Sequence, residues 1–150
     1  MDKKAYALRI ARATQVQLVI ITHELLLEFL KEAEERRANG DADGFFSASK
    51  KAARALQELI NGLDFKQEIA LNLYDLYVYA NGELCRAQFS LEAPLEHISE
   101  IFKELKEAWE HIEDKDLEKD KKNAPSVTAG MTYDKHGLTE ITESSTDFLA

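Results

Sequence analysis

The sequence is poor in cysteine, proline and glycine, and each shortage excludes a class of structure. The single cysteine, Cys85, excludes an internal disulfide and a zinc site built from cysteines. With only two prolines and six glycines, the 150-residue chain has few positions for the tight turns that join short strands. Alanine, leucine, glutamate and lysine are abundant instead, and these residues favour helices. The composition therefore predicts an all-α protein with long helices.

Long apolar runs and an excess of positive charge are also missing. No stretch of the sequence approaches the roughly 18 uncharged apolar residues that a membrane-spanning helix requires. Residues 1–6 also lack the apolar core of a signal peptide, so we expect a cytoplasmic protein without membrane insertion. The 19 Lys and Arg residues against 28 Asp and Glu residues give a formal net charge of −9. Because phosphate groups repel such a chain, we do not expect nucleic acid as a partner.

What the sequence does contain is helical periodicity, which predicts four long helices. The periodic segments run over residues 16–37, 43–61, 64–89 and 94–115. Asn-Gly pairs follow the first two segments, and both residues accept the left-handed conformation that ends many helices. Asp43 is a suitable N-cap for the second helix, and Asp64 and Gln67 have the spacing of a capping box for the third. Short turns between amphipathic helices predict an antiparallel up-down-up-down four-helix bundle.

Both ends of the chain differ from this bundle. Residues 1–13 contain four basic residues against one acidic residue, and their apolar pattern predicts a short helical arm that docks on the bundle. Residues 123–150 are rich in Thr, Ser, Gly and Asp and show no helical period, which predicts a mobile tail. We therefore divide the chain into a helical-bundle domain with its arm, residues 1–120, and a flexible polar tail, residues 121–150.

The first and third predicted helices carry more apolar surface than a small bundle needs, because each has a second apolar face beyond the stripe that packs on a core. The residues that we place on these second faces, and expect to line a groove, are Ile20, His23, Leu27, Leu71, Tyr74 and Val78. Either a larger or dimeric bundle buries this excess, or the excess forms a groove for an amphipathic helix or extended peptide of another protein. Gly82 lies inside the third helix, where glycine costs about 1 kcal/mol relative to alanine, and predicts a close contact there.

No arrangement of residues predicts catalysis, a cofactor or a metal site. A di-iron bundle needs Glu-x-x-His on two helices, but none of the four histidines has a carboxylate three residues earlier. His23 and Glu24 begin the zinc-protease motif His-Glu-x-x-His, yet Leu27 occupies the place of the second histidine. The sequence also has no glycine-rich phosphate-binding motif. We therefore do not expect an enzyme, a bound cofactor or a metal.

Several segments, taken in order along the chain, resemble the FliS family of flagellar secretion chaperones. They are RIARATQVQLVIITHELLLEFLKEA (9–33), Leu63-Asp64-Phe65, EIALNLYDLYVYANGELCRAQ (68–88) and LKEAWEHI (105–112). Residues 129–133 are similar to the tails of clostridia-like members. The resemblance implies a cytoplasmic, non-catalytic helical bundle that binds the C-terminal region of flagellin, prevents its premature polymerisation and delivers it to the flagellar export apparatus. A component of the export gate is a further candidate partner.

The resemblance also implies a role for the N-terminal arm, whose tyrosine borders the groove in this family; here Tyr6 is the only residue suited to that part. Two departures from the family pattern lie in the first long helix and just before it. Thr14-Gln15 stands where many members have Ser-Pro, and His23 stands where many have tyrosine. We expect a monomer or weak homodimer, and the alternative function is a homodimeric helical interaction module that does not bind flagellin.

The polar tail contains scattered apolar residues, as a disordered ligand does. They are Met131, Tyr133, Leu138, Ile141, Phe148 and Leu149. We hypothesise that the tail transiently occupies the flagellin groove and so lowers the apparent affinity for flagellin. The alternative is a solvated tail without a role in binding.

Overall fold

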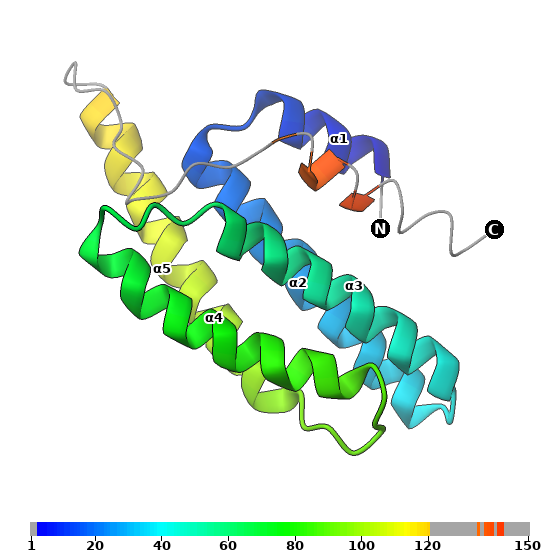
Figure 1. Cartoon of the computed structure of the whole chain (residues 1–150). Coiled ribbons are helices and arrows are strands. Elements are labelled where there is room, and N and C mark those ends of the chain that lie inside the picture. The colour runs from blue at the N-terminus through cyan, green and yellow to red at the C-terminus, as the bar shows by residue number, and fades with distance from the viewer. Residues whose placement is uncertain (1–2, 121–134, 136, 140, 143–150) are drawn as a thin grey trace.

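The computed structural model describes residues 3–120, 135, 137–139, 141 and 142. Its helices are α1 (Lys3–Arg12), α2 (Gln15–Ala38), α3 (Ala42–Asn61), α4 (Glu68–Ala87) and α5 (Glu96–Asp120). The long helices α2 to α5 alternate in direction, and α1 lies at the end of the bundle where α2 begins (Figure 1). The predicted all-α, up-down-up-down bundle with a helical arm is confirmed.

A capping box fixes the change of direction between α1 and α2. The backbone N–H of Gln17 donates to Thr14 Oγ1 over 3.2 Å, and the backbone N–H of Thr14 donates to Gln17 Oε1 over 3.0 Å. Two N–H groups that the helix leaves without an internal partner are thereby satisfied. Although Thr14-Gln15 departs from the family pattern, the start of α2 is therefore still capped.

Two predicted helix starts are wrong by a few residues. Asp41, not Asp43, caps α3, because its Oδ1 accepts a hydrogen bond from the backbone N–H of Gly44 over 2.9 Å. The Asp64 capping box is absent, since Asp64 Oδ1 accepts from the backbone N–H of Lys66 and α4 begins only at Glu68. At Asp64 a short-range side-chain bond thus forms a turn instead of a helical cap, whereas at α3 the cap lies two residues earlier than expected.

The breadth of apolar surface on α2 is explained by its neighbours. α2 packs against both α3 and α5, so two sides of this helix are covered by other parts of the chain. Its buried residues accordingly follow one another almost without a gap from Val16 to Leu26 and include the polar Thr22 and His23. For α2, the bundle itself buries the excess that the sequence shows.

At the other end of the bundle, Arg37 joins the last turn of α2 to the α4–α5 loop. Its Nη1 donates to the carbonyl oxygens of Leu91 and Ala93, at 2.9 Å and 2.7 Å. Its Nη2 donates to Glu34 over 2.6 Å, and the guanidinium carbon lies 4.8 Å from the centre of the Phe45 ring. One side chain thus holds α2, α3 and the loop together at this end.

The described part of the tail is helical where the sequence showed no helical period. Residues 135, 137–139, 141 and 142 have helical conformation, and Leu138 and Ile141 are buried with exposed fractions of 0% and 4%. Figure 1 shows these orange turns beside α1. The tail residues Met131, Tyr133, Phe148 and Leu149 lie outside the described residues.

Candidate functional site

An apolar strip on the outward side of α4 is the main candidate site. Leu71, Tyr74 and Val78 have exposed fractions of 54%, 39% and 47%, and their spacing of three and four residues places them on one helix face. Phe65, from the α3–α4 loop, extends this strip, because its ring packs edge-on against Tyr74 with 5.4 Å between centroids. We call Phe65, Leu71, Tyr74 and Val78 the α4 outer face.

The opposite face of α4 explains why the outer one is free. Its buried residues, which include Leu73, Tyr77 and Leu84, point into the bundle, and α4 packs against α3. α4 therefore has one apolar face for the core and a second that the described residues leave exposed. Exposed apolar side chains grouped in this way mark interaction surfaces.

Gly82 lies one turn beyond Val78 and does not make the predicted close contact. A β-carbon built at Gly82 would meet no described atom within 4 Å, and the residue is exposed. The helix therefore bears the cost of an interior glycine without a close contact, within the described part of the chain, to explain it. At this point the α4 outer face continues into bare backbone, which a partner can approach closely.

The α2 residues of the predicted groove are placed differently. Ile20 and His23 have exposed fractions of 6% and 0%, so the expectation that they face outward is wrong. The His23 ring lies 5.8 Å from that of Phe102 on α5, because α5 covers this side of α2. Leu27 is half-buried and lines a hollow between α2 and α5 of about 450 Å³.

The predicted residues do not form one groove. α2 packs against α3 and α5 while α4 packs against α3, so the outward sides of α2 and α4 are not adjacent (Figure 1). Leu71, Tyr74 and Val78 share a surface, Leu27 lies in a separate hollow, and Tyr6 lies on the arm. Phe65 was missed by the sequence reasoning, although the Leu-Asp-Phe turn that contains it was among the segments of the family resemblance.

His23 is a neutral core residue. Its pKa is lowered from 6.5 to about 4, mainly by burial; the hydrogen bond to the Val19 carbonyl opposes this shift and the charge of Lys106 adds to it. At neutral pH its Nδ1–H donates to that carbonyl over 2.8 Å, and Nε2 has no hydrogen-bond partner among the described residues. His23 is thus enclosed in the bundle and does not present a charge to a partner.

Tyr77 on α4 is the second buried polar group without a partner in the described part of the chain. Its ring stacks on Phe102 with 6.0 Å between centroids, so Phe102 packs against both Tyr77 and His23. Burial raises the pKa of the Tyr77 phenol, and its hydroxyl oxygen has no hydrogen-bond partner among the residues that the structure describes. A buried hydroxyl of this kind destabilises the fold, because its bonds to water are lost without replacement.

Removing this hydroxyl is expected to stabilise the protein. Tyr77→Phe keeps the stacked ring and should raise the free energy of unfolding by about 1 kcal/mol, measured by urea denaturation. Tyr79→Phe is the matched control, since the exposed Tyr79 hydroxyl pairs with His97 Nε2 at 2.7 Å and its loss should not stabilise the fold. A Tyr77→Phe variant less stable than the wild type would show that this hydroxyl has a partner.

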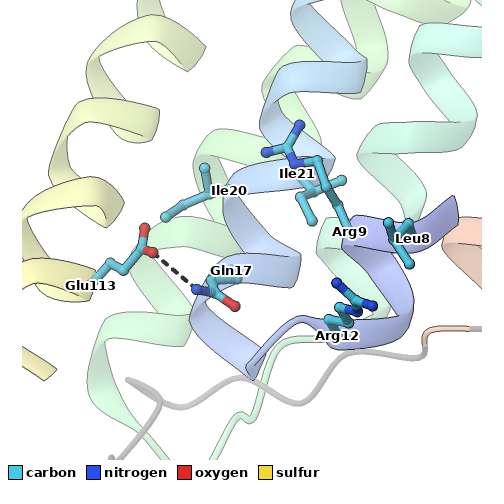
Figure 2. Close-up of a pocket in the computed structure, with 7 residues that line it drawn as sticks. All are labelled: Leu8, Arg9, Arg12, Gln17, Ile20, Ile21 and Glu113. Atoms are coloured by element: carbon cyan, nitrogen blue, oxygen red, sulfur yellow. Dashed lines mark hydrogen bonds between the residues drawn. The ribbon is translucent and has the colours of Figure 1, made fainter. Parts of the chain in front are cut away.

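A pocket of about 330 Å³ lies beneath α1. Figure 2 shows that α1 supplies Leu8, Arg9 and Arg12, that α2 supplies Gln17, Ile20 and Ile21, and that α5 supplies Glu113. Gln17 Nε2 donates to Glu113 Oε1 over 3.2 Å and joins the start of α2 to α5. The pocket has an apolar floor from α2 and a basic edge from α1.

Tyr6 and Arg9 hold α1 against α2. Arg9 forms a two-point ion pair with Glu24, with N···O distances of 2.6 Å and 2.9 Å, and its guanidinium lies 5.5 Å from the centre of the Tyr6 ring. Partial burial raises the pKa of Tyr6, and the nearby carboxylates of Glu24 and Glu28 raise it further. Tyr6 therefore belongs to the contact between the arm and α2.

The described residues contain no group of three or more His, Cys, Asp and Glu side chains suited to bind a metal ion. None of the described helices combines the length and the apolar character needed to span a membrane.

Comparison with known proteins identifies the family. A family model described as Flagellar protein FliS matches residues 3–116, which is more than half of the chain. A search of curated proteins and a search of solved structures each gave no match. The family resemblance seen in the sequence is confirmed, and the matched region contains the arm and all of the bundle except the last four residues of α5. The chain belongs to the FliS family of flagellar export chaperones.

Proposed function

We propose that this chaperone binds the C-terminal region of flagellin on the α4 outer face, in the cytoplasm and without catalysis. Binding keeps flagellin from polymerising prematurely, and the complex delivers flagellin to the export apparatus. Family membership supports the chaperone role, and the observation that carries the choice of surface is the exposure of Leu71, Tyr74 and Val78 on one helix face.

An amphipathic helix is the form of flagellin that suits this surface. Such a helix lays its apolar side chains against an apolar strip, and the open backbone at Gly82 allows a bulky partner side chain to approach. A segment that folds only on binding gives up part of its interaction energy to ordering, which leaves the complex weak enough to release its cargo. The exposed α4 outer face therefore suits a chaperone that binds flagellin reversibly and must release it for export.

The test is titration calorimetry of the full chain with a peptide from the C-terminal region of the cognate flagellin. We expect one-to-one binding with a negative heat-capacity change, because apolar surface is buried. A folded, monodisperse protein that shows no heat of binding would contradict the proposal. Light scattering on the same sample addresses the alternative, since a tight dimer would favour a homodimeric interaction module that buries the α4 outer face.

We propose a monomer or weak homodimer in solution, and an export-gate component as a second candidate partner. Leu27, in the hollow between α2 and α5, and Tyr6, on the arm, remain predicted contact residues away from the α4 outer face. Their separate positions support the proposal that more than one surface of the bundle contacts a partner.

A further inference from the structure

The residue pattern on the outward side of α4 occurs twice along the helix. Three residues of the α4 outer face have a counterpart eleven residues later: Leu71 pairs with Gly82, Tyr74 with Cys85 and Val78 with Phe89. An eleven-residue period corresponds to about 3.67 residues per turn, close to the 3.6 of an α-helix. The two sets therefore lie nearly in line, and this line runs along almost the whole of α4.

Phe89 ends this line and is strongly exposed. Its exposed fraction of 87% is the highest among the large apolar side chains that the structure describes. Although α4 ends at Ala87, Gln88 keeps helical backbone angles, φ −78° and ψ −13°, and the backbone N–H of Phe89 donates to the Arg86 carbonyl over 3.0 Å. Because the chain keeps winding up to Phe89, this ring continues the apolar line of α4 instead of leaving it.

Gly82 leaves an open place in the middle of the line. A β-carbon built at Gly82 would meet no described atom within 4 Å, although an interior glycine destabilises a helix. Val78 lies one turn before Gly82 and Phe89 two turns after it, and both are exposed apolar residues. Only the small side chain of Cys85 lies between Gly82 and Phe89 on this side of the helix. A bulky side chain of another molecule therefore has room over Gly82, with apolar contacts on both sides.

The charges beside the line indicate which kind of helix fits it. Glu68 and Asp75 are exposed, lie seven residues apart on the same side of α4 and are placed less than a quarter turn from the line. Neither carboxylate forms an ion pair within the described part of the chain. Lys or Arg side chains along this edge of a bound helix would be favoured by charge complementarity. The surface thus suits an amphipathic helix that is apolar on one side and basic beside it.

We propose that the flagellin helix lies along α4 from Leu71 to Phe89 and places one large apolar side chain over Gly82, between Val78 and Phe89. Gly82 then fixes the register of the bound helix, and Phe89 is a contact residue of the site. At about 1.5 Å per residue the line is about 27 Å long, which corresponds to about five turns of bound helix. This placement rests on the proposed function, since it takes flagellin to be the occupant of the α4 outer face.

Gly82→Leu should stabilise the free protein and weaken the complex. Leucine is a better helix former than glycine and has open space here, so the midpoint temperature of unfolding should rise by about 2 °C. The new side chain occupies the place of the flagellin side chain, so calorimetry should show at least about tenfold weaker binding of the flagellin C-terminal peptide. Asn72→Leu, at an exposed position outside the line, is the matched control and should bind within about threefold of the wild type. Wild-type or higher affinity of Gly82→Leu would overturn the proposal.

Phe89→Ala tests the far end of the line. The ring is almost fully exposed in the free protein, so the variant should keep its helix content while its affinity for the same peptide falls at least about tenfold. Leu91→Ala removes another exposed apolar side chain from the α4–α5 loop, outside the line, and should bind within about threefold of the wild type. Equal affinities of Phe89→Ala and the wild type would also overturn the proposal.

Cys85 reports on the bound state without any substitution, because it is the only cysteine of the chain and its side chain is exposed. A saturating, cysteine-free flagellin peptide should slow the alkylation of Cys85 by iodoacetamide at least about tenfold, since the bound helix covers the thiol. Binding with unchanged alkylation would overturn the placement along α4 and leave the proposed function standing. Absence of any heat of binding would contradict the proposed function itself, and the placement with it.

Discussion

Val78→Asp is expected to weaken binding of the flagellin C-terminal peptide by at least about 100-fold while the bundle stays folded. Val78 has an exposed fraction of 47% in the free protein, so a carboxylate there remains solvated and the fold tolerates it. In the complex the same carboxylate would be buried against apolar side chains without a partner, at a cost of several kcal/mol. A 100-fold loss of affinity corresponds to about 2.7 kcal/mol, which lies within that cost.

The measurement is titration calorimetry of the variant beside the wild type, with circular dichroism to confirm equal helix content. Asn72→Asp is the matched control, because it adds the same charge at an exposed position of α4 outside the α4 outer face. This control should bind within about threefold of the wild type, since solvated surface charges have small effects. If Val78→Asp retained wild-type affinity, flagellin would have to bind on another surface.

Acidification from pH 7 to pH 4 is expected to remove about 3 kcal/mol of stability through His23 alone. Burial lowers the pKa of His23 from 6.5 to about 4, so between these values the unfolded chain holds a proton that the folded chain does not. The contribution of the neutral ring is therefore complete above about pH 6.5 and decreases as the pH falls toward 4. At about 1.4 kcal/mol per pKa unit the difference amounts to about 3 kcal/mol.

Urea denaturation at several pH values between 4 and 7 measures this loss, and two histidine variants isolate its source. His23→Leu should lose about 3 kcal/mol less than the wild type over this range, whatever its stability at pH 7. His111→Leu changes an exposed histidine and should keep the full pH dependence. Equal losses in the wild type and in His23→Leu would show that protonation of His23 does not govern acid stability.

The helices were predictable from sequence because their apolar periodicity is strong and few glycines and prolines interrupt it. Helix starts were less predictable, since Asp41, Asp43 and Asp64 are all good caps by residue type and only the turn geometry decides which one acts. Asp64 illustrates this point: its carboxylate bonds two residues ahead and forms a turn before α4.

The candidate site was predictable on α4 and not on α2, although both helices have two apolar faces. Periodicity shows that a face is apolar but does not show which neighbour covers it. α5 and α1 cover the second face of α2 and bury Ile20 and His23, whereas the α4 outer face stays exposed. A sequence contains no local signal for this difference, because it arises from the order in which the four helices surround the core.

The helical turns in the described part of the tail were not predictable for a related reason. Leu138 and Ile141 are two apolar residues in a polar segment, too few to show a helical period. They are buried in the core, and the neighbouring residues Lys135 and Gly137 lie against α1 and α3, which are more than 70 residues away in the chain. The hypothesis that the tail occupies the flagellin groove stays a prediction, and in the described structure the tail residue Lys135 bonds to Ala11 of α1.

The contacts of Arg37 make the two ends of the bundle unequal in local stability. Where α2 ends, this one side chain bonds to Glu34 and to two carbonyl oxygens of the α4–α5 loop. Where α2 begins, a ten-residue helix is held by a partly exposed ion pair and a short segment of the tail. Local opening and proteolysis should therefore begin at the α1 end rather than at the end that Arg37 holds, so the two ends of the bundle differ in local stability.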